Sequence, residues 1–385
     1  MRFAMSRPMR TERITRPTST ATGRAPRRAR ESGVRHLVFL GPGSLEWQES
    51  TDPRLADDRD AIVRPLAVAR CDLDPAIALG LYPMTPPFAL GHEMVGEVVE
   101  RGDHAGAAEI GDRVIVPFQI SCGSCPMCQR GLTNACAAIP PGSAFGLGPH
   151  GGIDFGGALA DLVRVPFADH LLLPLPDGLD PVVAAGIPDN VSDGYRTVAG
   201  PLAELPGAPV LVVGGLAASV GLYAVAAAVA LGSDRVLYVD QDRSRLALAA
   251  SLGAETIDAP LAGLALETPF PITVDACVLD EGRDLALRST SPCGTCTSVS
   301  GGAASRSSLP LQSMYLKGIR YEIGRVHARS TAPAVLGLVA DGRLDPGAVI
   351  TRTVPFEDAV DAMIEPEIKI VFCSTMAPPE PASVR

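Results

Sequence analysis

The hydrophobic and polar positions of this chain follow one pattern in its first half and another in its second. From about residue 34 to residue 190, short apolar runs are separated by Gly and Pro, and this spacing predicts an all-β unit of barrel or sandwich type. The strands that the pattern predicts in this part are Leu37–Leu40, Ile62–Ala69, Met94–Glu100, Arg113–Val116 and Leu159–Val165.

In the second half, strands alternate with helices. Pro209–Val213 is a continuous apolar strand of the kind buried on both faces of a parallel sheet, and a glycine-containing turn joins it to a helical run, Ser219–Leu231. A second strand, Arg235–Val239, ends in Asp240 and is followed by a helix over Arg243–Leu252. This alternation predicts βαβ units and a doubly wound parallel sheet, so the fold class is α/β. Two further strands and a helix are predicted at Ile272–Val278, Thr295–Val299 and Thr331–Ala340.

One uncharged stretch, Leu205–Ser233, is long enough to raise the question of a membrane span, which needs about 20 apolar residues. Proline and glycine residues interrupt this stretch. We therefore interpret it as a buried strand, a turn and a buried helix, and we expect no membrane segment.

Basic residues are concentrated at the N terminus. Residues 1–35 carry ten Arg against Glu12 and Glu31, which leaves a net charge of −18 on the rest of the chain. A body this acidic is a poor general ligand for nucleic acid. Residues 1–33 have neither apolar periodicity nor an h-region, so we interpret them as a disordered basic extension or as the product of an upstream start codon. An Arg-rich transit peptide and a nucleic-acid-binding arm are the alternatives, and the cytoplasm is the expected compartment.

The strongest local signal is a group of closely spaced cysteines, Cys122-x-x-Cys125-x-x-Cys128-x7-Cys136. In a reducing compartment, clustered cysteines more often bind metal than form disulfides. Four thiolates close a tetrahedral zinc site with no open coordination position, so the role of such a site is structural. The common iron–sulfur spacing has a shorter last gap, and zinc is therefore the favoured metal.

A second candidate metal site is scattered along the chain. A catalytic zinc usually has three protein ligands and one open position, and Cys71, His92 and Asp189 would supply that set. Glu93 would be a neighbouring partner of the metal or a ligand that exchanges with water. Taken singly, a Cys or a His is more often a packed core residue than a ligand.

The turn between the first parallel strand and its helix is a candidate dinucleotide site. Gly214 and Gly215 follow the strand, and Ser219, Val220 and Gly221 open the helix, whose N terminus would carry the pyrophosphate. The glycine spacing departs from G-x-G-x-x-G, because the loop is about two residues longer. Asp240 ends the second strand, where a carboxylate accepts hydrogen bonds from a ribose 2′-OH and repels a 2′-phosphate, so NAD is favoured over NADP.

Several longer motifs support a family assignment. The stretch ALGHEMVGEVVERG followed by GDRV, the cysteine group after it, and the later segments RLALAASLGAE, LKGI and DGRLDPGAVITRTVPFEDAVDAM resemble zinc-containing alcohol dehydrogenases of the medium-chain dehydrogenase/reductase superfamily. The resemblance covers roughly residues 34–372. It implies a GroES-like β-domain at 34–190 and 328–385, which holds two zinc ions, and a Rossmann domain at 191–327.

The resemblance also assigns roles to single residues. It implies that Cys71 and His92 are ligands of the catalytic zinc, that Asp189 is the third ligand, and that Asp74 is the acidic residue near the metal. Arg245 resembles a basic position that flanks the adenosine ribose in NAD-using relatives. The alternative role of Asp189 is a helix N-terminal cap.

The sequence departs from the family at the positions that move the alcohol proton. Relatives carry Ser or Thr two residues after the ligand Cys and often a His a few residues later, whereas this chain has Leu73 and Ala76. Proton transfer must therefore use another route, for which Asp72, Asp193 and a chain of water molecules are the candidates.

These features predict a zinc-dependent oxidoreductase that transfers a hydride between an alcohol, or an aldehyde hydrate, and NAD. One alternative is an aldehyde reductase or dismutase with tightly held cofactor. A second is a catalytically silent, zinc-stabilised nucleotide-binding protein. The resemblance implies a homo-oligomer, either a dimer or a tetramer.

Overall fold

The computed structural model describes residues 33–106, 108–148, 152, 154–301 and 306–374. The basic N-terminal extension lies outside these residues, as does His150, a histidine of a Gly-rich loop for which the sequence predicts no site role. Within the described residues, no helix is long and apolar enough to cross a membrane. The stretch Leu205–Ser233 contains strand β9 and helix α6, so its interpretation as a buried strand, turn and helix is confirmed.

The first half of the chain forms mostly antiparallel sheets. A three-stranded sheet has the order β2-β1-β4, and a larger sheet has the order β15-β16-β3-β5-β6-β8, with β7 pairing to β3. These strands are β1 (Val34–Gly41), β2 (Ser44–Ser50), β3 (Ala61–Ala69), β4 (Phe88–Ala89), β5 (Glu93–Arg101), β6 (Arg113–Val116), β7 (Val163–Val165), β8 (Leu173–Pro174), β15 (Arg352–Pro355) and β16 (Ile370–Cys373).

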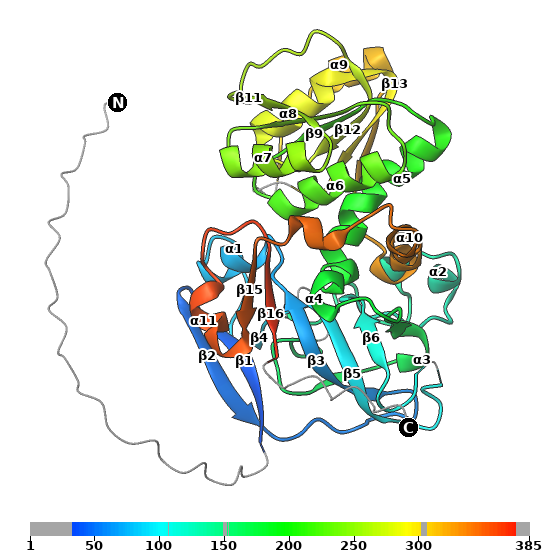
Figure 1. Cartoon of the computed structure of the whole chain (residues 1–385), viewed down its shortest axis with the longest axis vertical. Coiled ribbons are helices and arrows are strands. Elements are labelled where there is room, and N and C mark those ends of the chain that lie inside the picture. Colours follow the sequence, from blue (N-terminus) through cyan, green and yellow to red (C-terminus); the bar gives the residue numbers. More distant parts are fainter. Residues whose placement is uncertain (1–32, 107, 149–151, 153, 302–305, 375–385) are drawn as a thin grey trace, which may run out of the picture. The chain divides into compact units, whose positions relative to one another are not determined.

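A segment near the C terminus completes the larger sheet. β16 pairs antiparallel with β3, and Val371 lies opposite Ala69. Figure 1 shows this arrangement as red β16 beside blue β3. The pairing brings the residues that precede β16 close to the end of β3, where Cys71 follows.

The middle of the chain forms a six-stranded sheet in which every pair of neighbours is parallel. Its strand order is β11-β10-β9-β12-β13-β14. Successive strands are added on one side of β9 up to β11 and on the other side from β12 onward, as in a doubly wound nucleotide-binding sheet. β9 is wholly buried because its four residues are all apolar. The strands are β9 (Val210–Val213), β10 (Val236–Asp240), β11 (Glu255–Asp258), β12 (Phe270–Asp275), β13 (Thr290–Ser298) and β14 (Arg320–Ile323).

Helices connect and cover these sheets. The α-helices are α1 (Asp74–Ala78), α2 (Pro126–Gln129), α3 (Ala168–Leu171), α4 (Pro181–Ala184), α5 (Ser192–Glu204), α6 (Ala218–Ala230), α7 (Arg243–Ser251), α8 (Asp280–Ser289), α9 (Leu311–Lys317), α10 (Ala328–Ala340) and α11 (Ala359–Ala362). Short 3₁₀ or π turns are η1 (Thr133–Ala135), η2 (Ile187–Val191), η3 (Pro346–Val349) and η4 (Phe356–Asp358). α6 is almost entirely buried, since most of its residues are Ala, Val or Leu and it packs between α5 and β9.

The predicted α/β fold, a GroES-like β-domain with a Rossmann sheet, is confirmed. One predicted strand is too long: only Val163–Val165 of the segment Leu159–Val165 is a strand, because Leu159 and Ala160 instead make irregular backbone bonds to residues of the β1 region.

Candidate catalytic and cofactor sites

The side chains of Cys71, His92, Glu93 and Asp189 meet at the ends of three elements. Cys71 follows β3, His92 precedes β5, and Glu93 begins β5 opposite Ala69. Because β3 and β5 are antiparallel, the end of one strand lies beside the start of the other. Asp189 comes from η2, which leads into α5. The structure thus brings together residues that are scattered in the sequence.

The potential ligand atoms of these four side chains all lie within 4.8 Å of one another. His92 Nε2 is 3.4 Å from Asp189 Oδ2. Asn190 donates its amide hydrogens to Cys71 Sγ at 3.4 Å and to Asp189 Oδ2 at 3.2 Å. The buried amide of Asn190 therefore holds two of the potential ligands in place.

Asp74 orients the histidine. Its Oδ2 accepts a hydrogen bond from the Cys71 backbone N–H at 2.9 Å, and its Oδ1 lies 3.5 Å from His92 Nδ1. The Nε2 atom of the ring is left directed at Asp189. A carboxylate behind one ring nitrogen is the usual support for a histidine that binds metal through the other. Burial lowers the pKa of His92, but the carboxylates of Asp74 and Asp189 outweigh burial and raise that pKa to about 9.

Glu93 has a buried ion pair. Lys369 donates to both carboxylate oxygens of Glu93, at 2.8 and 2.9 Å, and both side chains are fully buried. Lys369 also donates to Asn190 Oδ1 at 2.6 Å. Burial raises the pKa of Glu93, and Lys369 opposes this rise. The ion pair holds the carboxylate beside the cluster.

The cluster fits a zinc ion. Burial and the neighbouring carboxylates of Asp189 and Asp74 raise the pKa of the Cys71 thiol, and burial raises the pKa of Asp74. Anionic groups packed this tightly are stabilised by a bound cation. Thiolate, imidazole and carboxylate are the ligands that zinc takes in proteins, and three of them leave one coordination position open.

The alternative role of Asp189 as a helix cap is wrong. Val191, not Asp189, is the N-cap residue of α5, and it makes no side-chain capping bond. The Asp189 carboxylate points toward His92 and Asn190 instead.

Asp193 is one candidate for the proton transfer that Leu73 cannot perform. Leu73 packs against the hydrophobic core, so it leaves no hydroxyl at that position. Asp193 lies four residues after Asp189, on the same face of the helical segment. Its carboxylate accepts a hydrogen bond from Arg196 Nε. Burial raises the pKa of Asp193 to about 6, the nearby Asp189 adds to the rise, and Arg196 opposes it.

The four clustered cysteines form the other candidate metal site, and their Sγ atoms also lie within 4.8 Å of one another. Backbone N–H groups point at the sulfurs: Cys128 N donates to Cys125 Sγ at 3.5 Å, and Cys122 N donates to Cys136 Sγ at 3.4 Å. Backbone hydrogen bonds from Cys128 and Ala137 lower the pKa of Cys125 to about 6. These residues fit a closed four-thiolate zinc site.

The glycine turn after β9 has the steric properties of a dinucleotide site. A Cβ on Gly214 would lie 2.2 Å from Tyr238 Oη and 2.3 Å from Asp240 Oδ2. A Cβ on Gly221 would lie 3.0 Å from Ala276 Cβ, so glycine permits close packing of α6 on the sheet. Gly215 has a positive φ of 157° and a Cβ there would lie 2.7 Å from Cys277 Cα.

Asp240 lies at the end of β10, beside this turn. Its carboxylate accepts hydrogen bonds from Tyr238 Oη at 2.8 Å and from Arg245 Nε and Nη2 at 2.8 and 2.7 Å. Burial raises the pKa of Asp240, but the hydrogen bonds from Arg245 and the backbone outweigh burial and lower it. Arg245 is thus the charged partner of Asp240, at the place where an adenosine ribose would bind.

A carboxylate takes two of the backbone donors at the N terminus of α6. Asp72 Oδ2 accepts hydrogen bonds from the backbone N–H groups of Ser219 at 3.0 Å and Val220 at 3.3 Å. The helix N terminus at which the sequence predicts the pyrophosphate is therefore contacted by a carboxylate of the chain itself.

Sequence reasoning missed Lys369 and Asn190, which hold the cluster together. Lys369 is one of only two lysines in the chain and lies in the apolar run Ile368–Phe372. A lysine within such a run is the signal that could have revealed a buried ion pair. Asn190 directly follows a predicted ligand, but no sequence pattern distinguishes it from a surface amide.

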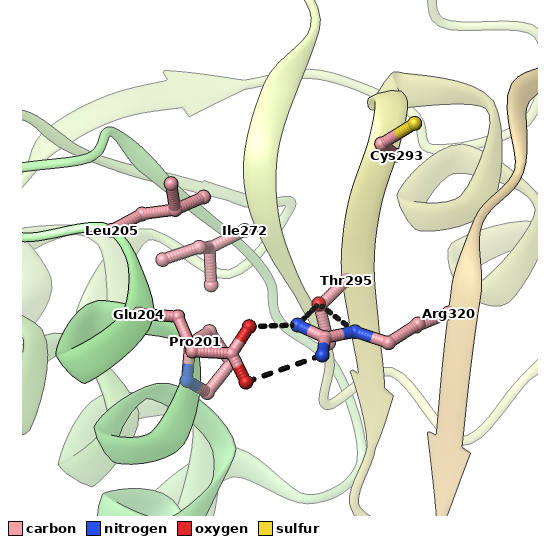
Figure 2. Close-up of a pocket in the computed structure, with 7 residues that line it drawn as sticks. All are labelled: Pro201, Glu204, Leu205, Ile272, Cys293, Thr295 and Arg320. Atoms are coloured by element: carbon pink, nitrogen blue, oxygen red, sulfur yellow. Dashed lines mark hydrogen bonds and ion pairs between the residues drawn. The ribbon is translucent and has the colours of Figure 1, made fainter.

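One pocket on the parallel sheet is lined by none of the residues of the two metal clusters. This pocket of about 370 Å³ is formed by the end of α5 and the strands β12, β13 and β14. Figure 2 shows that Glu204 and Arg320 face one another across it, and their oxygens and nitrogens approach to 2.6 Å. Cys293 lies on its rim. The pocket contains none of the predicted site residues.

Comparison with known proteins identifies the family. The model of the alcohol dehydrogenase GroES-like domain matches residues 57–177. The chain is 32% identical over 330 residues to a probable zinc-binding alcohol dehydrogenase of Mycobacterium tuberculosis, with 85% of this chain and 83% of the relative covered. It is 32% identical over 277 residues to a glutathione-independent formaldehyde dehydrogenase of Pseudomonas aeruginosa, covering 66% of this chain and 65% of that protein.

A solved structure agrees with these relatives. The alcohol dehydrogenase of Thermus sp. ATN1 superposes with a TM-score of 0.81 at 32% identity, covering 88% of this chain and 99% of that one. The chain belongs to the zinc-containing alcohol dehydrogenases of the medium-chain dehydrogenase/reductase superfamily. It is an oxidoreductase acting on CH–OH groups, and the cofactors that go with this family are zinc and a nicotinamide dinucleotide.

Proposed function

We propose that this enzyme oxidises a small alcohol, or the hydrate of an aldehyde, at the cluster of Cys71, His92 and Asp189, with NAD as the hydride acceptor. The observation that carries this proposal is the buried convergence of these three ligand types within 4.8 Å. Zinc held there supplies a Lewis acid that lowers the pKa of an alcohol hydroxyl. NAD supplies the hydride chemistry, and the protein supplies position and electrostatics.

The surrounding residues prepare this site. The Asp74 carboxylate lies 3.5 Å behind the ring of His92, and Asn190 donates to both Cys71 and Asp189. The ring of Phe118 packs 5.6 Å from the ring of His92, measured between centroids, and it excludes water from one side of the cluster. A dry wall strengthens the electrostatic effect of a bound cation.

Asp193 is the residue that we propose as the proton acceptor in place of the missing hydroxyl relay. Its pKa of about 6 means that the carboxylate is mostly ionised at neutral pH yet basic enough to take a proton. Asp72 is a poorer candidate, because its carboxylate is engaged by the N terminus of α6.

NAD rather than NADP is proposed because Asp240 presents a carboxylate at the ribose position, where a 2′-phosphate would be repelled. Comparison of the affinities for NADH and NADPH tests this choice. An affinity for NADPH equal to that for NADH would contradict it.

Zinc content tests the proposed site. We propose two zinc ions per chain, one in the cluster of Cys71 and one among the four clustered cysteines. Cys71→Ser should reduce the zinc content from two to one and abolish alcohol-dependent NAD reduction, while the fold persists because the other zinc remains. Cys293→Ser is the matched control, since that cysteine is exposed and belongs to neither cluster. One zinc in both wild type and Cys71→Ser would favour a silent, zinc-stabilised nucleotide-binding protein instead.

A second candidate is oxidation or dismutation of hydrated formaldehyde. The similarity to a glutathione-independent formaldehyde dehydrogenase favours it, as does the apolar Leu73 where the relay hydroxyl is missing. Consumption of formaldehyde without added NAD would indicate a dismutase with tightly held cofactor. Strict dependence on added NAD would indicate a dehydrogenase.

We also propose a homo-oligomer assembled through the outer edge of the parallel sheet. β14 is an edge strand, and beside it Leu311, Tyr315 and Leu316 of α9 and Ile323 of β14 are exposed apolar side chains. Exposed apolar patches of this kind mark association surfaces. Leu316→Glu should convert the oligomer to smaller species in analytical ultracentrifugation.

We propose the cytoplasm as the compartment of this enzyme. We also propose that the GroES-like domain comprises residues 34–190 and 328–385 and that the Rossmann domain comprises residues 191–327.

A further inference from the structure

A carboxylate lies at the N terminus of the helix that would bind the cofactor phosphates. Asp72, which follows β3, contacts the first turn of α6, a segment 147 positions away in the sequence. Its two oxygens lie 3.0 and 3.2 Å from Ser219 N, and its Oδ2 lies 3.0 Å from Ser219 Oγ and 3.3 Å from Val220 N. The side chain thus makes the contacts that an anionic ligand makes at a helix N terminus.

Few other donors remain in this turn. The N–H groups of Leu216 and Ala217 donate to the carbonyl oxygens of Cys277 and Ala276, both at 3.1 Å. The N–H of Gly221 is already within the helix ladder, bonded to the carbonyl of Ala217 at 3.0 Å. A pyrophosphate that bonds to the N–H groups of Ser219 and Val220 must therefore displace Asp72.

Asp72 opposes phosphate binding through its negative charge as well as through its position. A carboxylate and a phosphate a few ångströms apart repel one another, and the repulsion is strong where both are partly shielded from water. The positive charges that act on Asp72 are Lys369 and Arg70, and both are bonded elsewhere: Lys369 to Glu93 and Asn190, and Arg70 to backbone carbonyl oxygens.

We propose that Asp72 is a tethered competitor of the cofactor's pyrophosphate and therefore determines how weakly this enzyme holds its dinucleotide. The inference rests on the proposed use of NAD. When the dinucleotide binds, Asp72 leaves the N terminus of α6 and the phosphate takes over its hydrogen bonds. When the dinucleotide leaves, Asp72 returns and satisfies the helix again. A cofactor held in this way exchanges at each turnover.

The test uses Asp72→Asn in the full-length, zinc-loaded protein. Asparagine keeps the shape and the capping oxygen of the side chain but removes the charge. The affinity for NADH, followed by its fluorescence, and for ADP-ribose, followed by calorimetry, should rise about tenfold or more. Adenosine, which carries no phosphate, should bind wild type and variant equally. Asp180→Asn is the matched control, because Asp180 caps α4 through Val182 N at 2.8 Å and is exposed away from the site.

Circular dichroism and the melting temperature establish that each variant is folded, and Asp72→Ser serves as a second charge-free variant if Asp72→Asn is unstable. Equal or weaker binding of NADH by folded charge-free variants overturns the inference and leaves the proposed function intact. A gain in affinity for adenosine as large as that for NADH also overturns it, because the effect would then not involve phosphate. Absence of NADH binding by wild type and variants alike overturns both the inference and the proposed use of NAD.

Discussion

Asp193 is the proposed proton acceptor, so its ionisation is expected to affect turnover directly. Because an ionised carboxylate accepts a proton and a neutral one does not, alcohol oxidation should rise as the pH increases through about 6, the pKa of Asp193. Asp193→Asn removes the acceptor. We expect it to lower kcat by about 10²-fold or more at pH 7 and to remove the rise near pH 6. The measurement is the pH dependence of kcat for NAD reduction.

A conservative variant of Asp193 distinguishes a role in proton transfer from a purely structural role. Asp193→Glu retains a carboxylate and should recover part of the activity with a shifted pH profile. If Asp193→Asn keeps both the rate and the pH dependence of wild type, the proton leaves by another path and Asp193 is only the structural partner of Arg196.

At this scale the sequence grouped candidate ligands that the structure brings together, but it missed the residues that contact them. Cysteine and histidine are rare residues, and the resemblance to the family around Gly91-His92-Glu93 was enough to group Cys71 with His92. Asn190 and Lys369 carry no such pattern, because their partners come from other strands and helices. The carboxylate of Asp72 was considered for proton transfer, yet its contact with α6 depends on how two distant segments pack.

Among the elements, strands and helices with strong apolar patterns matched the structure to within a few residues. The predicted helix Arg243–Leu252 is α7, Arg243–Ser251, and its N terminus is fixed because Asp242 accepts bonds from Ser244 N and Arg245 N. The short helical turns were not predicted, since segments such as Ile187–Val191 are too short for a periodic pattern. One of these turns nonetheless carries Asp189.

Packing between α5 and α6 depends on a glycine. A Cβ on Gly194 of α5 would lie 2.7 Å from the backbone nitrogen of Ala224 in α6, a distance that forces the two helices apart. Gly194→Ala should therefore lower the free energy of unfolding by about 1–3 kcal/mol in a urea titration.

Gly200 provides the comparison within the same helix. It is exposed, and nothing lies within 4 Å of a Cβ built on it. Gly200→Ala should raise stability by up to about 1 kcal/mol, because alanine favours helix more than glycine does. Equal stability changes for the two variants would mean that backbone propensity, not helix contact, governs both positions.

Across the whole molecule, one buried hydrogen-bond chain joins the antiparallel sheet to the parallel one. Lys369 in the segment before β16 contacts Glu93 of β5 and Asn190 of η2. The Ser219 hydroxyl of α6 lies 2.8 Å from Asn190 Oδ1 and 3.0 Å from Asp72 Oδ2. The metal cluster and the turn after β9 are therefore linked through side-chain hydrogen bonds.

Lys369 is the positively charged residue of this hydrogen-bond network. Lys369→Met leaves the buried Glu93 carboxylate without its partner, and we expect the free energy of unfolding to fall by about 3–5 kcal/mol in urea. Adding Glu93→Gln should recover much of that loss, because no uncompensated charge then remains. Lys317 is the other lysine of the chain and serves as the control. Lys317→Met removes hydrogen bonds to two carbonyl oxygens and should lower the free energy of unfolding by about 1 kcal/mol. Additive losses in the double variant would contradict a coupled ion pair at the centre of the molecule.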